Sequence, residues 1–190
     1  MPYQFRKRKN VKTLIIYGSR WGGTVLVAEK IRDTLKKQGY SADAIDAKKN
    51  FKTLSEYDLF IVGSGIRADK WTKETMQFLK RNAELLRTKK IAMFVSCLMA
   101  EKQDQAGNKA KKQYLENIAE LYGLKPISFG YFGGFIDFRK SHGLIVDIMT
   151  RINRNSLRKN GLDTSKIHDT RNWSNIEAWT HELAKVSFDK

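Results

Sequence analysis

The sequence predicts one α/β domain in which helices cover both faces of a doubly wound, five-stranded parallel sheet of order 2-1-3-4-5. Two observations predict it. Short apolar runs alternate with segments whose apolar residues recur at helical spacing, and turns rich in glycine and serine follow the apolar runs. A chain of 190 residues is the usual size of a single domain. We expect a basic tail over residues 1–11 and the domain over residues 12–190.

The apolar runs place the five strands at residues 13–17, 41–46, 58–62, 90–95 and 127–135. Helices are expected around residues 24–35, 76–86, 115–122, 145–152 and 176–186, where apolar residues lie on one helical face. Thr72 is placed to cap the second helix, and Ser174 with Glu177 has the spacing of a capping box for the last. The polar, lysine-rich stretch 100–112 is expected to be a long loop, either a disordered surface segment or part of a binding pocket.

The charge of the chain is its unusual bulk property. Thirty-six Lys and Arg against twenty Asp and Glu leave a formal charge of +16, which attracts acidic partners. The basic residues are spread along most of the chain, so a purely solubilising role is the alternative. No apolar run is long enough to span a bilayer, and the lone Cys97 has no partner for an internal disulfide. We therefore expect a cytoplasmic protein, with peripheral contact at the inner face of the membrane as a further expectation.

The loop after the first strand carries the clearest chemical signal. Gly18-Ser19-Arg20-Trp21-Gly22-Gly23-Thr24 opens a helix, whose free N–H groups and dipole favour an anion. The hydroxyls of Ser19 and Thr24 add donors, Arg20 adds positive charge, and the glycines let backbone approach a phosphate. The loop is neither a Walker A motif nor G-x-G-x-x-G. It lies where the strand order reverses, which is where such sheets bind ligands.

Two more loops reach the same crevice, after the third and fourth strands. In the first, Ser64, Gly65, Ile66, Arg67 and Trp71 are candidates to contact a ligand; the Trp71 ring either stacks on it or packs at the start of the next helix. In the other, the candidates are Ser96, Cys97 and Leu98, with Cys97 a small buried residue rather than a redox thiol. His142 and His168 belong to no recognisable triad or ligand spacing, and we expect no metal.

The pattern resembles the phosphate loop of flavodoxins: a strand, then Ser19-x-x-Gly22-x-Thr24, then an amphipathic helix. Gly63-Ser64-Gly65-Ile66-Arg67 and Asp169-Thr170-Arg171-Asn172-Trp173 resemble the branch that includes the quinone-dependent protoporphyrinogen IX dehydrogenases of bacteria. The resemblance spans about residues 12–186 and implies a flavodoxin-like fold with bound FMN. Its phosphate would contact Ser19 to Thr24, and its ring the other two loops. Many flavodoxins have an acidic, tyrosine-containing third loop; this chain has no acid there before Glu101, which predicts a less negative potential.

The resemblance implies an FMN-dependent oxidoreductase that takes reducing equivalents from an acidic substrate such as a porphyrinogen and delivers them to a quinone or a redox partner protein. The alternative is a soluble, flavodoxin-type electron carrier for an acidic partner. A nucleic-acid-binding module that has lost the flavin is a third reading, which the intact loop 19–24 and the lack of an aromatic–basic motif argue against. The apolar segment 143–149 either packs on the sheet or rests on a membrane.

Overall fold

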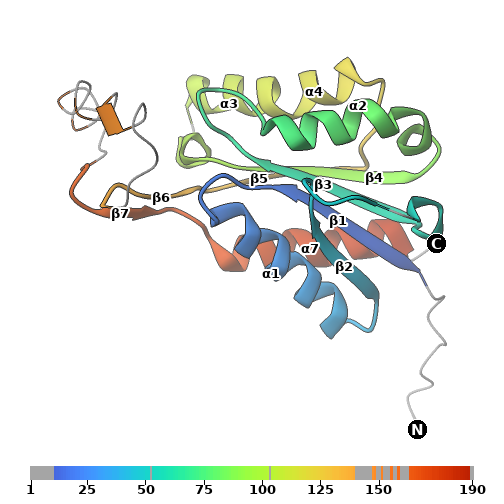
Figure 1. Cartoon of the computed structure of the whole chain (residues 1–190). Helices are drawn as coiled ribbons and strands as arrows, with labels where there is room; N and C mark the ends of the chain where they lie inside the picture. The colour runs from blue at the N-terminus through green and yellow to red at the C-terminus, as the bar shows by residue number, and fades with distance from the viewer. Residues whose placement is uncertain are drawn as a thin grey trace, which may run out of the picture.

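The structure is a computed structural model that describes residues 11–51, 53–102, 104–139, 147, 148, 151, 155, 158 and 163–188. Five parallel strands form one sheet in the order β2-β1-β3-β4-β5, which confirms the predicted fold class (Figure 1). The strands are β1 (Lys12–Gly18), β2 (Ser41–Asp46), β3 (Leu59–Gly65), β4 (Lys90–Ser96) and β5 (Ser128–Phe132). Residues 1–10 of the expected tail 1–11 and most of the segments 143–149 and 145–152 lie outside the described residues.

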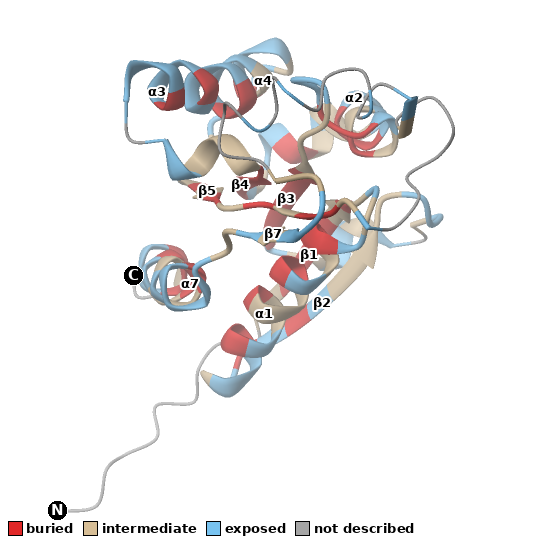
Figure 2. Cartoon of the chain, turned by 90° about the vertical axis from the view of Figure 1, so that its left-hand side faces the viewer, coloured by how far each residue is buried: buried red, intermediate tan, exposed pale blue. Residues whose placement is uncertain are grey.

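Helices cover the two faces of the sheet as separate layers (Figures 1 and 2). One face carries α1 (Gly23–Lys37) and α7 (Trp173–Phe188), and the other carries α2 (Lys73–Arg87), α3 (Gln105–Lys111) and α4 (Asn117–Leu121). Two apolar clusters fill the space between the layers, one on each face; Ile15 and Ile31 belong to the first, Leu14 and Leu79 to the second. Because both faces are covered, the central residues of β1, β3 and β4 are buried whichever face their side chains point to.

The stretch 100–112, expected to be a loop, is largely helical in the structure. A short 3-10 helix (Leu98–Glu101) precedes α3, and a π-helical segment (Lys112–Glu116) joins α3 to α4. Asp104 caps α3, since its carboxylate accepts a hydrogen bond from the Gly107 N–H at 2.9 Å. Ala110 is buried, so this segment contributes to the core. The sequence did not predict this helix because the lysines of the stretch 100–112 outnumber its apolar residues, and only Gly107 and Ala110 of α3 are buried.

The chain after β5 also differs from the single strand expected over 127–135. β5 ends at Phe132, and Phe135–Asp137 forms β6, which pairs antiparallel with β7 (Ile167–Asp169) in a separate two-stranded sheet. The two sheets are joined by Gly133 and Gly134, and the Gly134 N–H donates to Thr170 Oγ1 at 2.9 Å. This small sheet lies beside the carboxyl ends of the main strands, at the end of the molecule where α1 begins (Figure 1).

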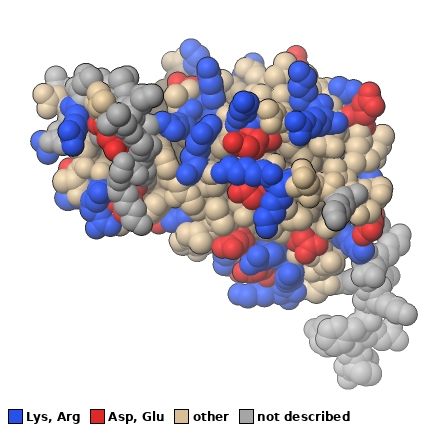
Figure 3. All heavy atoms as spheres, viewed as in Figure 1, with Lys and Arg blue, Asp and Glu red and all other residues tan. Residues whose placement is uncertain are grey.

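No helix among the described residues is long and apolar enough to cross a bilayer. Figure 3 shows Lys and Arg side chains spread over the whole visible face, with fewer Asp and Glu between them. On this face the positive charge is therefore distributed, as it is along the sequence.

Candidate functional site

The loop after β1 has the geometry of an anion site. Gly22, the residue that precedes α1, has φ 83°, a left-handed conformation that glycine adopts without strain. No side chain caps the start of α1. The first N–H groups of the helix therefore point toward the edge of the sheet, with the positive end of the helix dipole behind them. Thr24, in the first turn, is 4% exposed and contributes its hydroxyl to the same place.

The loop after β3 forms a tight hairpin. Arg67 and Lys70 exchange two backbone hydrogen bonds of 3.1 Å, and the two residues between them, Ala68 and Asp69, both have positive φ angles, 46° and 58°. This is the geometry of a type I′ turn, built here without glycine. The Tyr114 hydroxyl donates a hydrogen bond to the Asp69 carboxylate at the tip of the turn. The turn is thus fixed by a side chain of the π-helical segment, which lies about 45 residues further along the chain.

Arg67 connects the hairpin to the phosphate loop. Its guanidinium lies 5.3 Å from the centre of the Trp21 ring, a cation–π contact between the first and second loops. The backbone of Gly65 also approaches the first loop closely: a Cβ at this position would lie 2.6 Å from Thr24 Oγ1. Glycine is therefore required here by close packing rather than by its φ angle.

The loop after β4 is fixed to its neighbours by the backbone. Ser96 accepts a hydrogen bond on its carbonyl from the Ile66 N–H at 3.2 Å, and its hydroxyl donates to the Gly133 carbonyl at 2.8 Å. Cys97 is buried, as predicted, and burial raises the pKa of its thiol to about 11. A thiol that stays protonated is a poor nucleophile, so Cys97 is inert at neutral pH.

Most of the predicted site residues converge on one small cavity of about 40 Å³ at the carboxyl ends of the strands. It is lined by residues from all three loops and by one residue outside them: Ser19, Arg20, Trp21, Gly23, Thr24, Gly65, Ile66, Arg67, Ser96 and Phe135. Gly22 shapes the loop, and Cys97 and Leu98 continue the chain from Ser96 without lining this cavity.

Two predicted residues lie elsewhere. Ser64 is fully buried, and its hydroxyl accepts from the Thr72 N–H at 2.9 Å and donates to the Gly65 carbonyl, so it ties β3 to the start of α2. Trp71 is 6% exposed in the core, and its indole N–H donates to the Tyr114 carbonyl at 2.7 Å. It packs at the start of α2, one of the two arrangements considered for it. Thr72 precedes α2 as expected, but its side chain makes no cap hydrogen bond and contacts Thr75 instead.

Sequence reasoning missed Phe135 and Arg171 as site residues. The side chain of Arg171 is 4% exposed, and its guanidinium contacts the rings of Phe135 and Trp173, at 4.8 and 4.7 Å from their centres. It donates to the carbonyl of Gly23, the first residue of α1, at 3.0 Å. It also donates to Asp169 at 2.6 Å, a pair that lowers the pKa of the Asp169 carboxyl. The sequence signal for Arg171 is the segment 169–173, which carries part of the resemblance.

His168 does not join this site. His168 lies in β7, where Nε2 is 2.9 Å from the Asp163 carbonyl oxygen, and its ring packs against Phe138. His142 is outside the described residues. Within the part of the chain that the structure describes, no group of His, Cys, Asp or Glu side chains is arranged to hold a metal ion.

The fold and the site define a class: a doubly wound α/β domain with an uncapped helix N-terminus and two further loops gathered at its topological switch point. Comparison with protein families gives the finer assignment. Residues 14–160 match the flavodoxin domain family, and the chain belongs to that family. Among curated proteins, none matches the sequence. Membership confirms the flavodoxin-like fold and supports FMN as the cofactor.

Two solved structures illustrate the fold. The rubredoxin oxygen:oxidoreductase of Desulfovibrio gigas is 14% identical with a TM-score of 0.56, and the match covers 92% of this chain and 35% of that protein. The present chain thus spans about a third of that enzyme's length. A short-chain flavodoxin associated with a PDU bacterial microcompartment is 9% identical with a TM-score of 0.55, and the match covers 93% and 99% of the two chains. At these identities the likeness is one of fold alone.

The residues present fit the phosphate end of FMN. A dianionic phosphate needs several donors converging on one point, and this loop offers free helix N–H groups, the Thr24 hydroxyl and the nearby guanidinium of Arg20. Two backbones approach there without side chains, at Gly23 and Gly65. The cradle therefore suits a compact anion, and the cations beside it compensate for its charge.

Proposed function

We propose that this protein is an FMN-dependent oxidoreductase of the protoporphyrinogen dehydrogenase-like type, which passes reducing equivalents from an anionic organic substrate to a quinone. The observation that carries the proposal is the positive lining of the flavin-side loops. Arg20 and Arg67 line the cavity at the phosphate loop, and no acidic side chain does. When bound there, FMN supplies the ability to take two electrons from an organic donor and release them to an acceptor.

The chain's own residues divide the work of binding. The start of α1 with Thr24 would hold the phosphate, while Ile66, Arg67 and Ser96 would border the ring. Cys97 and Leu98, which follow Ser96 in the chain, would lie further along the ring. Arg171 fixes the position of the first residue of α1 by donating a hydrogen bond to the Gly23 carbonyl. Trp71 lies beneath the hairpin, where the bond from its indole N–H to the Tyr114 carbonyl fixes the loop.

A soluble electron carrier for an acidic partner protein is the second candidate. The distribution of Lys and Arg over the surface in Figure 3 favours it, because a broadly positive face attracts an acidic docking surface from several orientations. The two candidates share the cofactor and differ in whether a small substrate reaches the flavin. Location in the cytoplasm, with peripheral attachment at the inner membrane face, suits the quinone-dependent candidate.

The first experiment establishes the cofactor. The purified protein, as isolated or after incubation with FMN, should show the absorption bands of oxidised flavin and retain them on gel filtration. Thr24→Val removes one phosphate donor while keeping the side-chain shape, and a hydrogen bond to a charged group is worth about 1.5–3 kcal/mol, so FMN affinity should fall about tenfold or more. Thr34→Val, a buried threonine further along α1, is the matched control and should bind FMN normally.

A second experiment separates the two candidates. Holoprotein that oxidises protoporphyrinogen IX with a quinone as acceptor would support the oxidoreductase. Rapid exchange of single electrons with a flavodoxin reductase, without oxidation of the porphyrinogen, would support the carrier. Failure to retain FMN under any condition would contradict both.

A further inference from the structure

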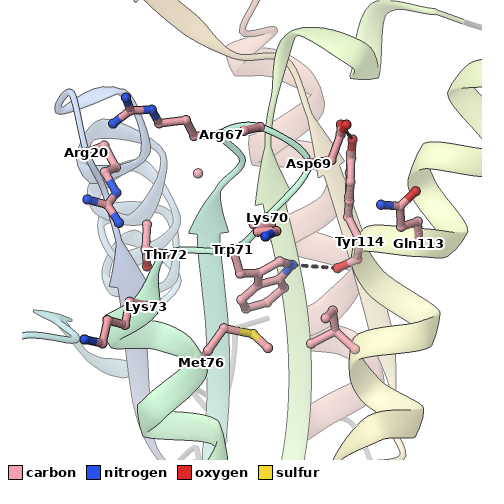
Figure 4. Close-up of a pocket in the computed structure, with 13 residues that line it drawn as sticks. Arg20, Arg67, Asp69, Lys70, Trp71, Thr72, Lys73, Met76, Gln113 and Tyr114 are labelled. Carbon is pink, nitrogen blue, oxygen red and sulfur yellow. Dashed lines mark hydrogen bonds between the residues drawn. The ribbon is translucent and has the colours of Figure 1, made fainter. Parts of the chain in front are cut away.

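A second, larger cavity lies on the α2 side of the hairpin; we call it the α2 cavity. It has a volume of about 530 Å³, within the range of about 300–1,000 Å³ that is usual for sites of small organic ligands. The hairpin, the first turn of α2 and the helix that contains Tyr114 form its walls (Figure 4). Its lining residues are Arg20, Gly65, Arg67, Ala68, Asp69, Lys70, Trp71, Thr72, Lys73, Met76, Gln113, Tyr114 and Ile118.

The rim of the α2 cavity is strongly positive. Four cationic side chains line it: Arg20, Arg67, Lys70 and Lys73. Among the described residues, no carboxylate lies within ion-pair distance of any of the four. The one acid in the lining is Asp69, whose carboxylate already accepts the Tyr114 hydroxyl. An anion entering the cavity would therefore find four cations and no competing carboxylate ion pairs.

The floor of the α2 cavity is apolar and fixed. Trp71 is held in place by the bond from its indole N–H to the Tyr114 carbonyl, which Figure 4 marks. Met76 and Ile118 add further apolar surface to the lining. Such a floor suits a flat hydrocarbon body, which gains by leaving water, while the cations on the rim suit acidic groups at its edges. The lining thus selects for an aromatic or otherwise flat molecule that carries several anionic groups.

The α2 cavity adjoins the phosphate-loop cavity without coinciding with it. Arg20, Gly65 and Arg67 line both, and the hairpin stands between them. Ser19, Thr24 and Ser96 line only the smaller cavity, whereas Trp71, Lys73 and Tyr114 line only the larger one. A ligand in the α2 cavity would lie on the other side of Arg67 from the FMN phosphate. Because Arg20 and Arg67 line both cavities, the charges of the two ligands would interact with the same cations.

We propose that the α2 cavity is a second binding site, which takes a flat organic polycarboxylate while FMN occupies the phosphate-loop site. This proposal rests on the proposed function only in one respect, which is that FMN occupies the adjoining phosphate-loop site. The binding of the anion depends on the lining of the α2 cavity itself. The occupant is either a substrate of the flavin or a ligand that is not consumed, and both have the same chemistry.

Calorimetric titration of the FMN-loaded protein with benzene-1,3,5-tricarboxylate tests the proposal. We expect saturable binding at low ionic strength that weakens as salt is added, because exposed charges are screened over about 10 Å at 0.1 M. The neutral benzene-1,3,5-tricarboxamide, which has the same shape, should not bind measurably. Lys73→Gln and Lys70→Gln should each weaken tricarboxylate binding about two- to fivefold, as expected for the loss of one exposed charge partner.

Lys80→Gln is the matched control, because Lys80 is an exposed lysine of α2 outside the lining. Equal weakening in Lys73→Gln and Lys80→Gln would mean diffuse attraction to a basic surface and would overturn the proposal. So would the absence of binding, or release of FMN in step with binding of the tricarboxylate, because the two would then share one site.

The flavin absorption of the same sample distinguishes a failure of the α2 site proposal from a failure of the proposed function. If the protein holds no FMN but still binds tricarboxylate in a Lys73-dependent manner, the proposed function fails and the α2 site stands. Oxidation of an anionic donor that binds competitively with the tricarboxylate would identify the occupant as a substrate. Competitive binding without turnover would identify a ligand that is not consumed.

Discussion

Tyr114→Phe removes one hydroxyl and tests whether the hairpin after β3 is held by the helix opposite. Tyr114 is 3% exposed, and its hydroxyl donates to the Asp69 carboxylate at the tip of a turn with two non-glycine residues at positive φ. A hydrogen bond to a charged acceptor is worth about 1.5–3 kcal/mol. Water can partly replace the hydroxyl at Asp69, which is exposed, so we expect the free energy of unfolding to fall by about 1–2 kcal/mol.

Urea unfolding at pH 7, followed by circular dichroism, measures this loss, and the melting temperature should fall by about 2–8 °C. Tyr57→Phe is the matched control: Tyr57 also donates to an aspartate, Asp43 at 3.1 Å, in an exposed position that holds no turn of this kind. Its cost should be within about 0.5 kcal/mol. A double-mutant cycle of Tyr114→Phe with Asp69→Asn isolates the pair. Equal stability of Tyr114→Phe and the wild type, or a coupling energy near zero, would refute the reasoning.

The same pair has a pH signature. Burial, reinforced by the bond to Asp69, raises the pKa of Tyr114 above its ordinary value of 10.0. The folded state therefore keeps a proton that the unfolded state loses above about pH 10, so the contribution is complete below that pH and is lost as the pH rises beyond it. The stability difference between the wild type and Tyr114→Phe should accordingly shrink in alkali.

Three further predictions concern the site. Gly22→Ala should cost about 1–2 kcal/mol of stability because Gly22 has φ 83°, and Gly22→Asn should cost less because asparagine tolerates that conformation; urea unfolding of both variants measures the difference, and equal costs would contradict it. Because burial raises the pKa of Cys97 from 9.0 to about 11, the native protein should react with a thiol reagent at pH 8 far more slowly than the urea-unfolded protein does; equal rates would show that the thiol is accessible. Arg171→Lys keeps the charge but loses the planar contact with Phe135 and Trp173, so FMN affinity should fall, as fluorescence titration would show; an unchanged affinity would remove Arg171 from the site.

The sheet and the first loop could be predicted because their signals are local. A buried parallel strand is a run of apolar residues, and β1, β3 and β4 each coincide with such a run to within one to three residues at either end. The phosphate loop follows from the order of strand, glycine-rich turn and helix, together with the rule that ligands bind where the strand order reverses. Neither inference needs contacts between distant residues.

The features that were mispredicted depend on such contacts. Ser174 and Glu177 have the spacing of a capping box, yet α7 begins one residue earlier and it is the side chain of Asn172 that accepts the N–H of Asn175, at 2.9 Å. Glu177 instead pairs with Lys30 of α1 at 2.6 Å. The spacing alone could not distinguish a local cap from a bond to a helix that is 147 positions away in sequence.

The part of the chain most distant in sequence from the phosphate loop completes it. The family match ends at residue 160, and Arg171 lies beyond that limit. It donates to the Gly23 carbonyl, and its guanidinium stacks on Phe135 of β6. A guanidinium that is 4% exposed loses most of its hydration, and its bond to Asp169 and its contact with two aromatic rings compensate for that loss. Folding of the segment 163–188 onto α1 therefore fixes the start of the helix that would bind the phosphate. We therefore expect FMN affinity to depend on this segment, which lies outside the matched residues 14–160, as well as on the loop itself.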